Sequence, residues 1–320
     1  MADSRLTKAS QTALRDYMGL SQDETMLVVC DENKREIGLA LFEAGKEMCN
    51  ESLYLEMKPR EINGEEPPAQ VAEMMKAVDL VVCPTTKSLT HTQARREATK
   101  LGIRVGTMPG ITLATMIRCL SADYNKIIEL SDNIAKRLRG VSYIRVVTEA
   151  GTDLNMSVRR RKVISSTGVL RNIGEWGNLP SGEVYLAPWE GKSSGVLVID
   201  GSMASIGLIK EPITVVIKDG YAKEITGKNE AQTLVKMLDA VGRDARAVAE
   251  FGIGTNYKAK ICGDILEDEK VLGTIHIAFG NNISMGGKIA VGIHVDGIVK
   301  KPTVYFDKEM VMQNGKLLIE

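Results

Sequence analysis

The chain has little histidine, few aromatic residues and no net charge, and these scarcities exclude classes of function. Only 3 of its 320 residues are histidine, and aromatic residues make up 4%. Few rings are therefore available to stack on nucleic-acid bases. Lysine plus arginine and aspartate plus glutamate each total 41, so no net field attracts nucleic acid or an anionic membrane. We expect neither as a partner, and we expect the basic run at residues 159–162 to be a solvated hairpin tip.

Cysteine patterns and long apolar runs are also missing. The 5 cysteines are an odd number without C-x-x-C spacing, which suits neither a disulfide framework nor a structural zinc ribbon. No apolar run approaches the roughly 20 residues that span a bilayer, and the N-terminus does not resemble a signal peptide. The sequence predicts a soluble, cytoplasmic protein.

The first half alternates short apolar runs with amphipathic segments. The apolar runs, expected to be strands, lie at residues 26–30, 53–57, 80–83 and 103–107. The amphipathic segments, expected to be helices, lie at residues 1–20, 35–48, 69–77, 91–101 and 111–120. This order predicts βαβ units and a doubly wound parallel α/β sheet in a scaffold domain over residues 1–140. The turn after the first strand, DENK, has no glycine and two carboxylates, so it excludes a dinucleotide pyrophosphate.

The second half has a different pattern. A helix at residues 124–139 leads to a hairpin turn, EAGT, and then to strand-like runs interrupted by one clear helix at residues 230–241. Such a run of short strands joined by turns is typical of antiparallel sheets. We predict an α+β, largely antiparallel domain over residues 141–320.

Two of the three histidines, His276 and His294, lie in this domain within alternating apolar residues, and Asp296 follows the second. Period-2 alternation indicates strands and puts His294 and Asp296 on one face. A second histidine from a neighbouring strand would complete a metal-ligand set. The alternative to a metal site is that both histidines are ordinary core residues whose ring nitrogens are hydrogen-bonded. His91, beside two threonines, is expected at a helix start rather than in a metal site.

Two glutamates lie at glycine-marked strand starts, Glu183 in NLPSGEVYLAP and Glu250 in EFGIGTN. With TIHIAFG and GIHVDG, these segments resemble, in order, the four metal-ligand segments of the aminopeptidase T family of metallopeptidases. The resemblance covers residues 140–320. It implies a homodimer and two divalent metal ions, zinc, cobalt or manganese, with Glu250 as the bridging carboxylate. The ligands that it implies are Glu183, Glu250, His276, His294 and Asp296.

The resemblance implies a metal-dependent aminopeptidase that removes the N-terminal residue of a peptide with a water activated by two metals. Glu175 is the candidate general base. The tyrosine that the family carries shortly after its first ligand histidine is absent, because residues 281–287 read NNISMGG. Two alternatives stay open. His276, His294 and Asp296 also match the 2-His-1-carboxylate triad of non-haem Fe(II) enzymes, as in the ring-cleaving dihydroxypyridine dioxygenases, which resemble the same fold. The other alternative is a non-catalytic relative.

Overall fold

The computed structural model describes residues 3–319, and their contacts divide the chain into two units. The N-terminal unit runs to Tyr124 and also contains Thr167–Ser181, while the remaining described residues form the C-terminal unit. The sequence predicts a single boundary at residue 140. The structure differs because Thr167–Ser181 returns to the first unit and adds a strand to its sheet.

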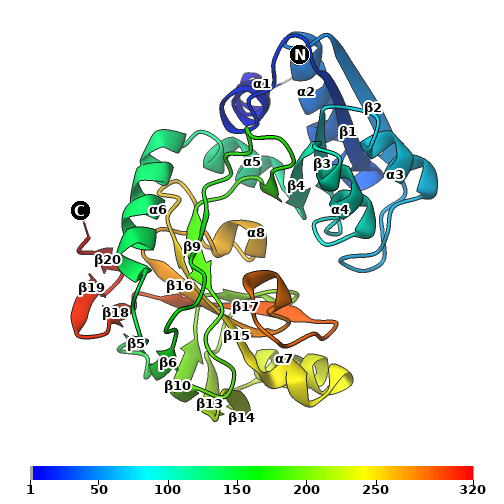
Figure 1. Cartoon of the computed structure of the whole chain (residues 1–320). Helices are drawn as coiled ribbons and strands as arrows, with labels where there is room; N and C mark the ends of the chain where they lie inside the picture. Colours follow the sequence, from blue (N-terminus) through cyan, green and yellow to red (C-terminus); the bar gives the residue numbers. More distant parts are fainter. Residues whose placement is uncertain (1–2, 320) are drawn as a thin grey trace. The chain divides into compact units, whose positions relative to one another are not determined.

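The N-terminal unit contains a parallel sheet of five strands in the order β2-β1-β3-β4-β8 (Figure 1). The strands are β1 (Thr25–Asp31), β2 (Glu51–Met57), β3 (Leu80–Thr85), β4 (Arg104–Pro109) and β8 (Trp176–Asn178). The helices are α1 (Ser4–Gln11), the π-helix η1 (Thr12–Tyr17), the 3-10 turn η2 (Glu32–Lys34), α2 (Arg35–Lys46), α3 (Ala69–Met75), α4 (Gln93–Lys100) and α5 (Leu113–Cys119).

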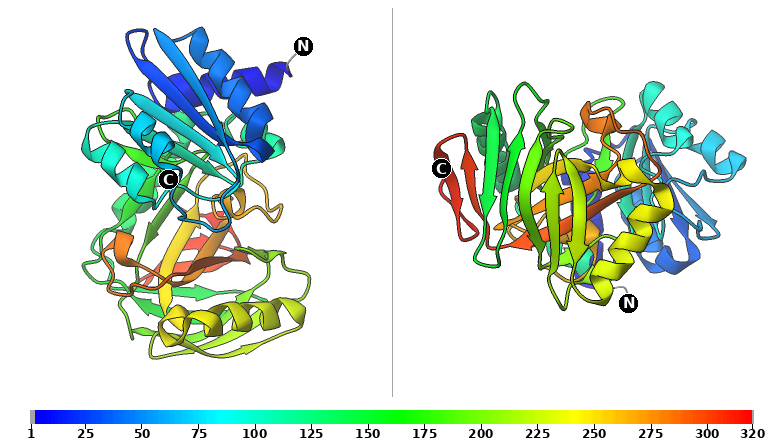
Figure 2. Two further views of the ribbon diagram at one scale, coloured as in Figure 1. Left: turned by 90° about the vertical axis from the view of Figure 1, so that its right-hand side faces the viewer. Right: turned by 90° about the horizontal axis from the view of Figure 1, so that it is seen from below.

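Helices cover both faces of this sheet (Figure 2). On one face, α2 approaches β1 so closely that a methyl group on Gly38 would lie 2.9 Å from the sulfur of Cys30. On the other, Val29 clusters with Val71 of α3. Because neighbouring residues of a strand point to opposite faces, β1 is buried on both sides. The predicted doubly wound fold is confirmed.

Among the described residues, the C-terminal unit contains two sheets and five helical segments. The first sheet has the order β14-β13-β10-β6-β5-β18-β19-β20 and the second β12-β11-β17-β16-β15-β9-β7. The strands of the first are β5 (Tyr143–Val147), β6 (Asp153–Ser157), β10 (Ser193–Ile199), β13 (Ile213–Lys218), β14 (Tyr221–Thr226), β18 (Thr303–Phe306), β19 (Glu309–Gln313) and β20 (Lys316–Leu317). Those of the second are β7 (Ile164–Ser166), β9 (Glu183–Leu186), β11 (Ser202–Met203), β12 (Gly207–Leu208), β15 (Val248–Gly254), β16 (Thr274–Gly280) and β17 (His294–Lys300). The helical segments are α6 (Tyr124–Leu138), α7 (Asn229–Val241), η3 (Arg243–Arg246), α8 (Ile265–Asp268) and η4 (Ile283–Met285).

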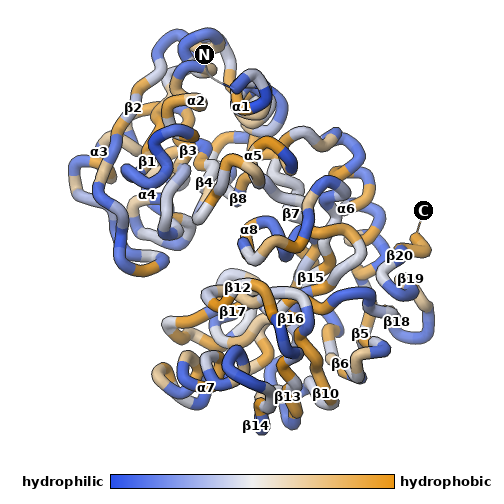
Figure 3. The backbone as a smooth tube through the Cα atoms, turned by 180° about the vertical axis from the view of Figure 1, so that it is seen from behind, coloured by the Kyte–Doolittle hydropathy of each residue, from blue (hydrophilic) through white to orange (hydrophobic). Residues whose placement is uncertain are grey.

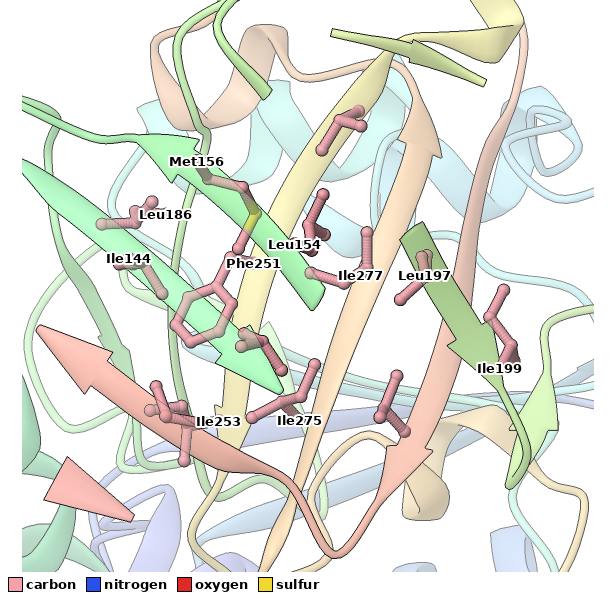
Figure 4. Close-up of a cluster of buried hydrophobic side chains, with 14 of the residues drawn as sticks. Ile144, Leu154, Met156, Leu186, Leu197, Ile199, Phe251, Ile253, Ile275 and Ile277 are labelled. Atoms are coloured by element: carbon pink, nitrogen blue, oxygen red, sulfur yellow. The ribbon is translucent and has the colours of Figure 1, made fainter. Parts of the chain in front are cut away.

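The core of this unit lies between its two sheets. Ile144 and Leu154 of the first sheet pack with Phe251, Ile275 and Ile277 of the second (Figure 4). The helix α6 adds one apolar side to the same core, and its alternating polar and apolar colours are visible in Figure 3. The predicted α+β, antiparallel architecture is confirmed. Since one face of the second sheet is used by the core, its polar residues must lie on the other face.

The structure also bears on membrane association. Within residues 3–319, no helix is both long and apolar enough to span a bilayer.

Candidate metal centre

The five residues predicted as metal ligands lie on one face of the second sheet. In antiparallel pairs, residues directly opposite each other share a face. Glu183 lies opposite Gly254, and His276 opposite Gly252. Asp296 lies opposite Ala278, which lies opposite Glu250. His294, two residues before Asp296, shares its face, as the sequence predicts. The strand geometry therefore collects all five side chains on the face away from the core. The five are Glu183, Glu250, His276, His294 and Asp296.

A β-bulge next to Glu250 turns Val248 away from this face. The pairing of β15 with β16 shifts between Val248 and Glu250, so that Val248 lies opposite Phe279 and Glu250 opposite Ala278. Without the extra residue, Ala249, both Val248 and Glu250 would point the same way. With it, Val248 enters the core and Glu250 points to the polar face.

The side chains converge closely. Nε2 of His276 lies 3.2 Å from Oε1 of Glu250 and 3.5 Å from Oε2 of Glu183. Nε2 of His294 lies 3.3 Å from Oε2 of Glu250 and 3.3 Å from Oδ1 of Asp296. Two overlapping groups can therefore hold a metal, and Glu250 belongs to both. Glu183, Glu250, Asp296 and His276 are buried, and His294 keeps 32% of its side chain exposed.

The tautomer of His294 follows from its second nitrogen. Nδ1 lies 2.7 Å from the backbone oxygen of Asn281, so it donates its proton there. With Nδ1 protonated in this way, Nε2 faces the site and is the nitrogen that a metal ion would bind, which is the arrangement of a metal-binding histidine. Nδ1 of His276 is buried and has no hydrogen-bond partner in the part of the chain that the structure describes.

A buried lysine borders the group. Lys270 is 1% exposed, and its ammonium lies 3.5 Å from Glu183 and forms an ion pair with Glu269. The neighbouring carboxylates outweigh burial and raise the pKa of Lys270, so it stays charged. Burial raises the pKa of Glu269 to about 8 and also raises that of Glu183.

The charge balance fits a divalent cation. Burial alone would lower the pKa of His276, but the carboxylates of Glu250 and Glu183 raise it to about 9. The pKa of His294 is raised in the same way, since Asp296 and Glu250 outweigh burial. In the metal-free protein, protons on both imidazoles thus offset the negative charge of the carboxylates in this site. A metal ion would replace one proton on each imidazole and bind the freed ring nitrogens together with the neighbouring carboxylate oxygens.

Other sequence expectations have mixed outcomes. Glu175 belongs to the N-terminal unit, where its carboxylate accepts two hydrogen bonds from Asn172. Thr92 caps α4, and His91 is exposed just before it, as predicted. The basic run at residues 159–162 is not fully solvated, because Arg161 is 6% exposed in side-chain area and pairs with Glu190.

Sequence reasoning did not identify Lys270 or Glu269. The run EDEK around them has the composition of a solvated helix end, and no local signal marks it as buried. Only the β-strand neighbours in space distinguish Lys270 from a surface lysine.

Comparison with known proteins determines the family. The family model described as 2,5-dihydroxypyridine 5,6-dioxygenase (NicX) matches residues 6–319. The chain belongs to this family. A curated relative, the 2,5-dihydroxypyridine 5,6-dioxygenase of Pseudomonas putida KT2440, is 24% identical over 259 residues, which cover 76% of this chain and 72% of the relative.

Two solved structures share the fold. The 2,5-dihydroxypyridine dioxygenase structure from Pseudomonas putida KT2440 has a TM-score of 0.82 at 19% identity and covers 98% of this chain and 96% of its own. The aminopeptidase T structure AmpT from Thermus thermophilus has a TM-score of 0.75 at 16% identity and covers 98% and 99%. At such low identity, both likenesses show the fold alone.

The predicted activity is wrong. The resemblance to aminopeptidase T correctly indicated the fold, but the NicX-family match along nearly the whole chain contradicts a metallo-aminopeptidase, protease or hydrolase. The error has a physical cause. The same imidazole and carboxylate donors suit both hydrolysis and oxygen chemistry.

Proposed function

We propose that this protein is an iron-dependent dioxygenase that opens the ring of a dihydroxylated pyridine. Membership of the NicX family and the named activity of the curated relative support the reaction class. The structural observation that carries the proposal is the placement of His276, His294 and Asp296 on neighbouring strands of one sheet face, with Glu250 within 3.3 Å of both imidazoles.

We assign one Fe(II) ion to these three side chains. Two imidazoles and one carboxylate form the facial triad of non-haem Fe(II) oxygenases, which leaves positions open. Nε2 of His294 faces the site and lies 3.3 Å from Oδ1 of Asp296, which suits a shared ion. Glu250 lies within 3.3 Å of both imidazoles and would border the ion. A general base for peptide hydrolysis, the role expected of Glu175, is not needed in this reaction.

Iron in such a triad supplies the open positions at which dioxygen and a ring hydroxyl react. The protein's own groups would prepare the substrate. Glu183 is buried and its pKa is raised, so its carboxylate is a stronger base than an exposed glutamate. It can accept the proton that a ring hydroxyl loses. Lys270, 3.5 Å from the same carboxylate, holds Glu183 in place and balances its charge while it is ionised.

The proposal is tested by oxygen uptake. Metal-free protein is loaded with Fe²⁺ under nitrogen, mixed with 2,5-dihydroxypyridine, and exposed to a measured amount of O₂. We expect one O₂ consumed for each ring opened, loss of the aromatic absorbance, and no uptake with 2-hydroxypyridine, which lacks the second hydroxyl. His294→Ala is the matched variant, because it lacks one of the three side chains assigned to the metal ion. Absence of uptake with every dihydroxypyridine isomer by fully loaded protein would refute the proposal.

A further inference from the structure

The loop between the two histidine strands holds the tautomer of His294. Residues 281–293 join β16 to β17, and the carbonyl that accepts from Nδ1 of His294 belongs to Asn281. The other polar groups of Asn281 form hydrogen bonds with the far end of the same loop. Its amide N–H donates to the backbone oxygen of Ile293 at 2.7 Å, and its side chain donates to that of Val291 at 2.9 Å. The position of this carbonyl therefore depends on the shape of the loop.

The next residue, Asn282, is completely buried and organises the loop. Its side-chain oxygen accepts from the backbone N–H of Ile289 at 2.8 Å. Its side-chain nitrogen donates to Oε1 of Glu190 at 3.0 Å. The same oxygen of Glu190 accepts from the backbone N–H of Lys288 at 2.8 Å. Gly287 is required beside it, because a methyl group there would lie 2.1 Å from the Asn282 side chain. One carboxylate thus contacts the loop at two points.

Glu190 is in turn held by Arg161. The guanidinium lies 2.5 Å from Oε2 of Glu190, donates to the backbone oxygens of Gly286 and Pro188, and stacks 4.0 Å from the ring of Trp189. The side chains of Arg161 and Glu190 are only 6% and 16% exposed. Hydrogen bonds from its own backbone N–H, from Lys288 and from Asn282, together with Arg161, outweigh burial and lower the pKa of Glu190, so it stays ionised.

A nearly buried ion pair adds little net stability, because desolvating both charges offsets most of their attraction. The presence of this ion pair is better explained if it fixes the orientation of neighbouring groups. We propose that Glu190, braced by Arg161, is a positioning residue that fixes the imidazole of His294 through Asn282 and Asn281. This inference rests on the proposed function, in which His294 is a metal ligand. Partners behind a metal ligand commonly contribute about 10–100-fold to metal affinity, and we expect this brace to act in that range.

The experiment uses Zn²⁺ as a diamagnetic probe in the full-length protein. The variants are Glu190→Ala, which removes both acceptor oxygens, and Glu190→Gln, which keeps one acceptor and the volume. The matched controls are Glu24→Ala and Glu24→Gln. Glu24 pairs with Arg104, another arginine with a nearly buried side chain, in the N-terminal unit. The readouts are Zn²⁺ affinity by competition with a chromophoric chelator and the ¹⁵N imidazole NMR spectrum, which is simple because the chain has 3 histidines.

We expect Glu190→Ala to weaken Zn²⁺ binding by about 10–100-fold and to shift the Nδ1 signal of His294. We expect Glu190→Gln to recover most of both, and the Glu24 variants to change neither. If Glu190→Ala does not fold, Asn282→Ala breaks the same chain of bonds and is predicted to have the same effect. Wild-type affinity and an unchanged Nδ1 signal in these variants would overturn the positioning role. Zn²⁺ binding that survives His294→Ala would instead overturn the ligand assignment, and the inference with it.

Discussion

Gly252 lies directly opposite His276 in the pairing of β15 with β16, and the imidazole occupies the space that a side chain at Gly252 would fill. A methyl group there would lie 2.0 Å from Nε2 and 2.2 Å from Cε1 of the ring. The backbone of Gly252 does not need glycine for its dihedral angles, since it does not lie in the left-handed region. The glycine is therefore explained by the room that the histidine needs.

The first prediction concerns this contact. Gly252→Ala should displace the imidazole of His276 and reduce metal affinity at least as much as the loss of an outer partner, about 10–100-fold. Metal content after gel filtration and chelator competition measure it. Gly292→Ala is the matched control, because a methyl group there meets nothing within 4 Å. Equal metal affinity in the two variants would contradict the steric role of Gly252.

The second prediction concerns Lys270. Replacing it by methionine keeps the volume but leaves Glu183 and Glu269 buried without their cation. Removing one partner of a buried ion pair typically costs about 3–5 kcal/mol. The free energy of unfolding of the metal-free variant should therefore be lower than that of the wild type by this amount. Urea titrations at neutral pH measure it. Adding Glu269→Gln should restore part of the loss. A loss below about 1 kcal/mol, the level of an exposed pair, would show that the lysine is not buried as described.

The third prediction concerns pH. In the metal-free protein the pKa of His276 is raised to about 9, and that of His294 is raised as well. Both imidazoles are therefore protonated at neutral pH, and a metal ion must displace these protons. Zn²⁺ affinity should rise steeply as the pH increases towards about 9 and level off above it. Affinity that is independent of pH between 6 and 9 would exclude the imidazoles as ligands.

The same shifts have a consequence for stability. A histidine whose pKa is higher in the folded than in the unfolded state stabilises the fold while it is protonated. Its contribution is complete below the unfolded value of roughly 6.5 and is lost as the pH rises through about 9. The contribution of His276 to the free energy of unfolding of the metal-free protein should therefore fall as the pH rises from roughly 6.5 to about 9. Metal-loaded protein should lack this dependence, because the ion replaces the proton.

Part of this site can be predicted from local sequence because a strand has a period of two. The spacing His294-x-Asp296 places both side chains on one face, and the pairing of β16 with β17 brings His276 beside them. Glu250 shares this face because it lies two residues before Gly252, the residue opposite His276. Strict alternation through VAEFGIG would put Val248 there as well, and nothing in the segment announces the bulge at Ala249 that turns Val248 into the core. The sequence alone does not pair Glu250 with the histidines; the resemblance to a known family does.

Other parts could not be predicted because they depend on the environment. Glu267 and Asp268 lie in a run that looks solvated, yet both are fully buried. Their carboxylates accept backbone hydrogen bonds from Lys260 and Cys262 at 2.8 and 2.7 Å, which replace water. The strand β8 was missed because Trp176–Asn178 is too short for a periodic pattern. The reaction itself was mistaken because hydrolases and oxygenases draw on the same ligand types.

The source of the oxygen atoms in the product tests the account most directly. Fe²⁺-loaded protein is supplied with 2,5-dihydroxypyridine and ¹⁸O₂ in ordinary water, and the ring-opened product is weighed by mass spectrometry. Our account predicts that both atoms of one O₂ molecule enter the product, and that His294→Ala forms none. Product whose new oxygen comes only from water, or release of amino acids from peptides without O₂ uptake, would contradict it.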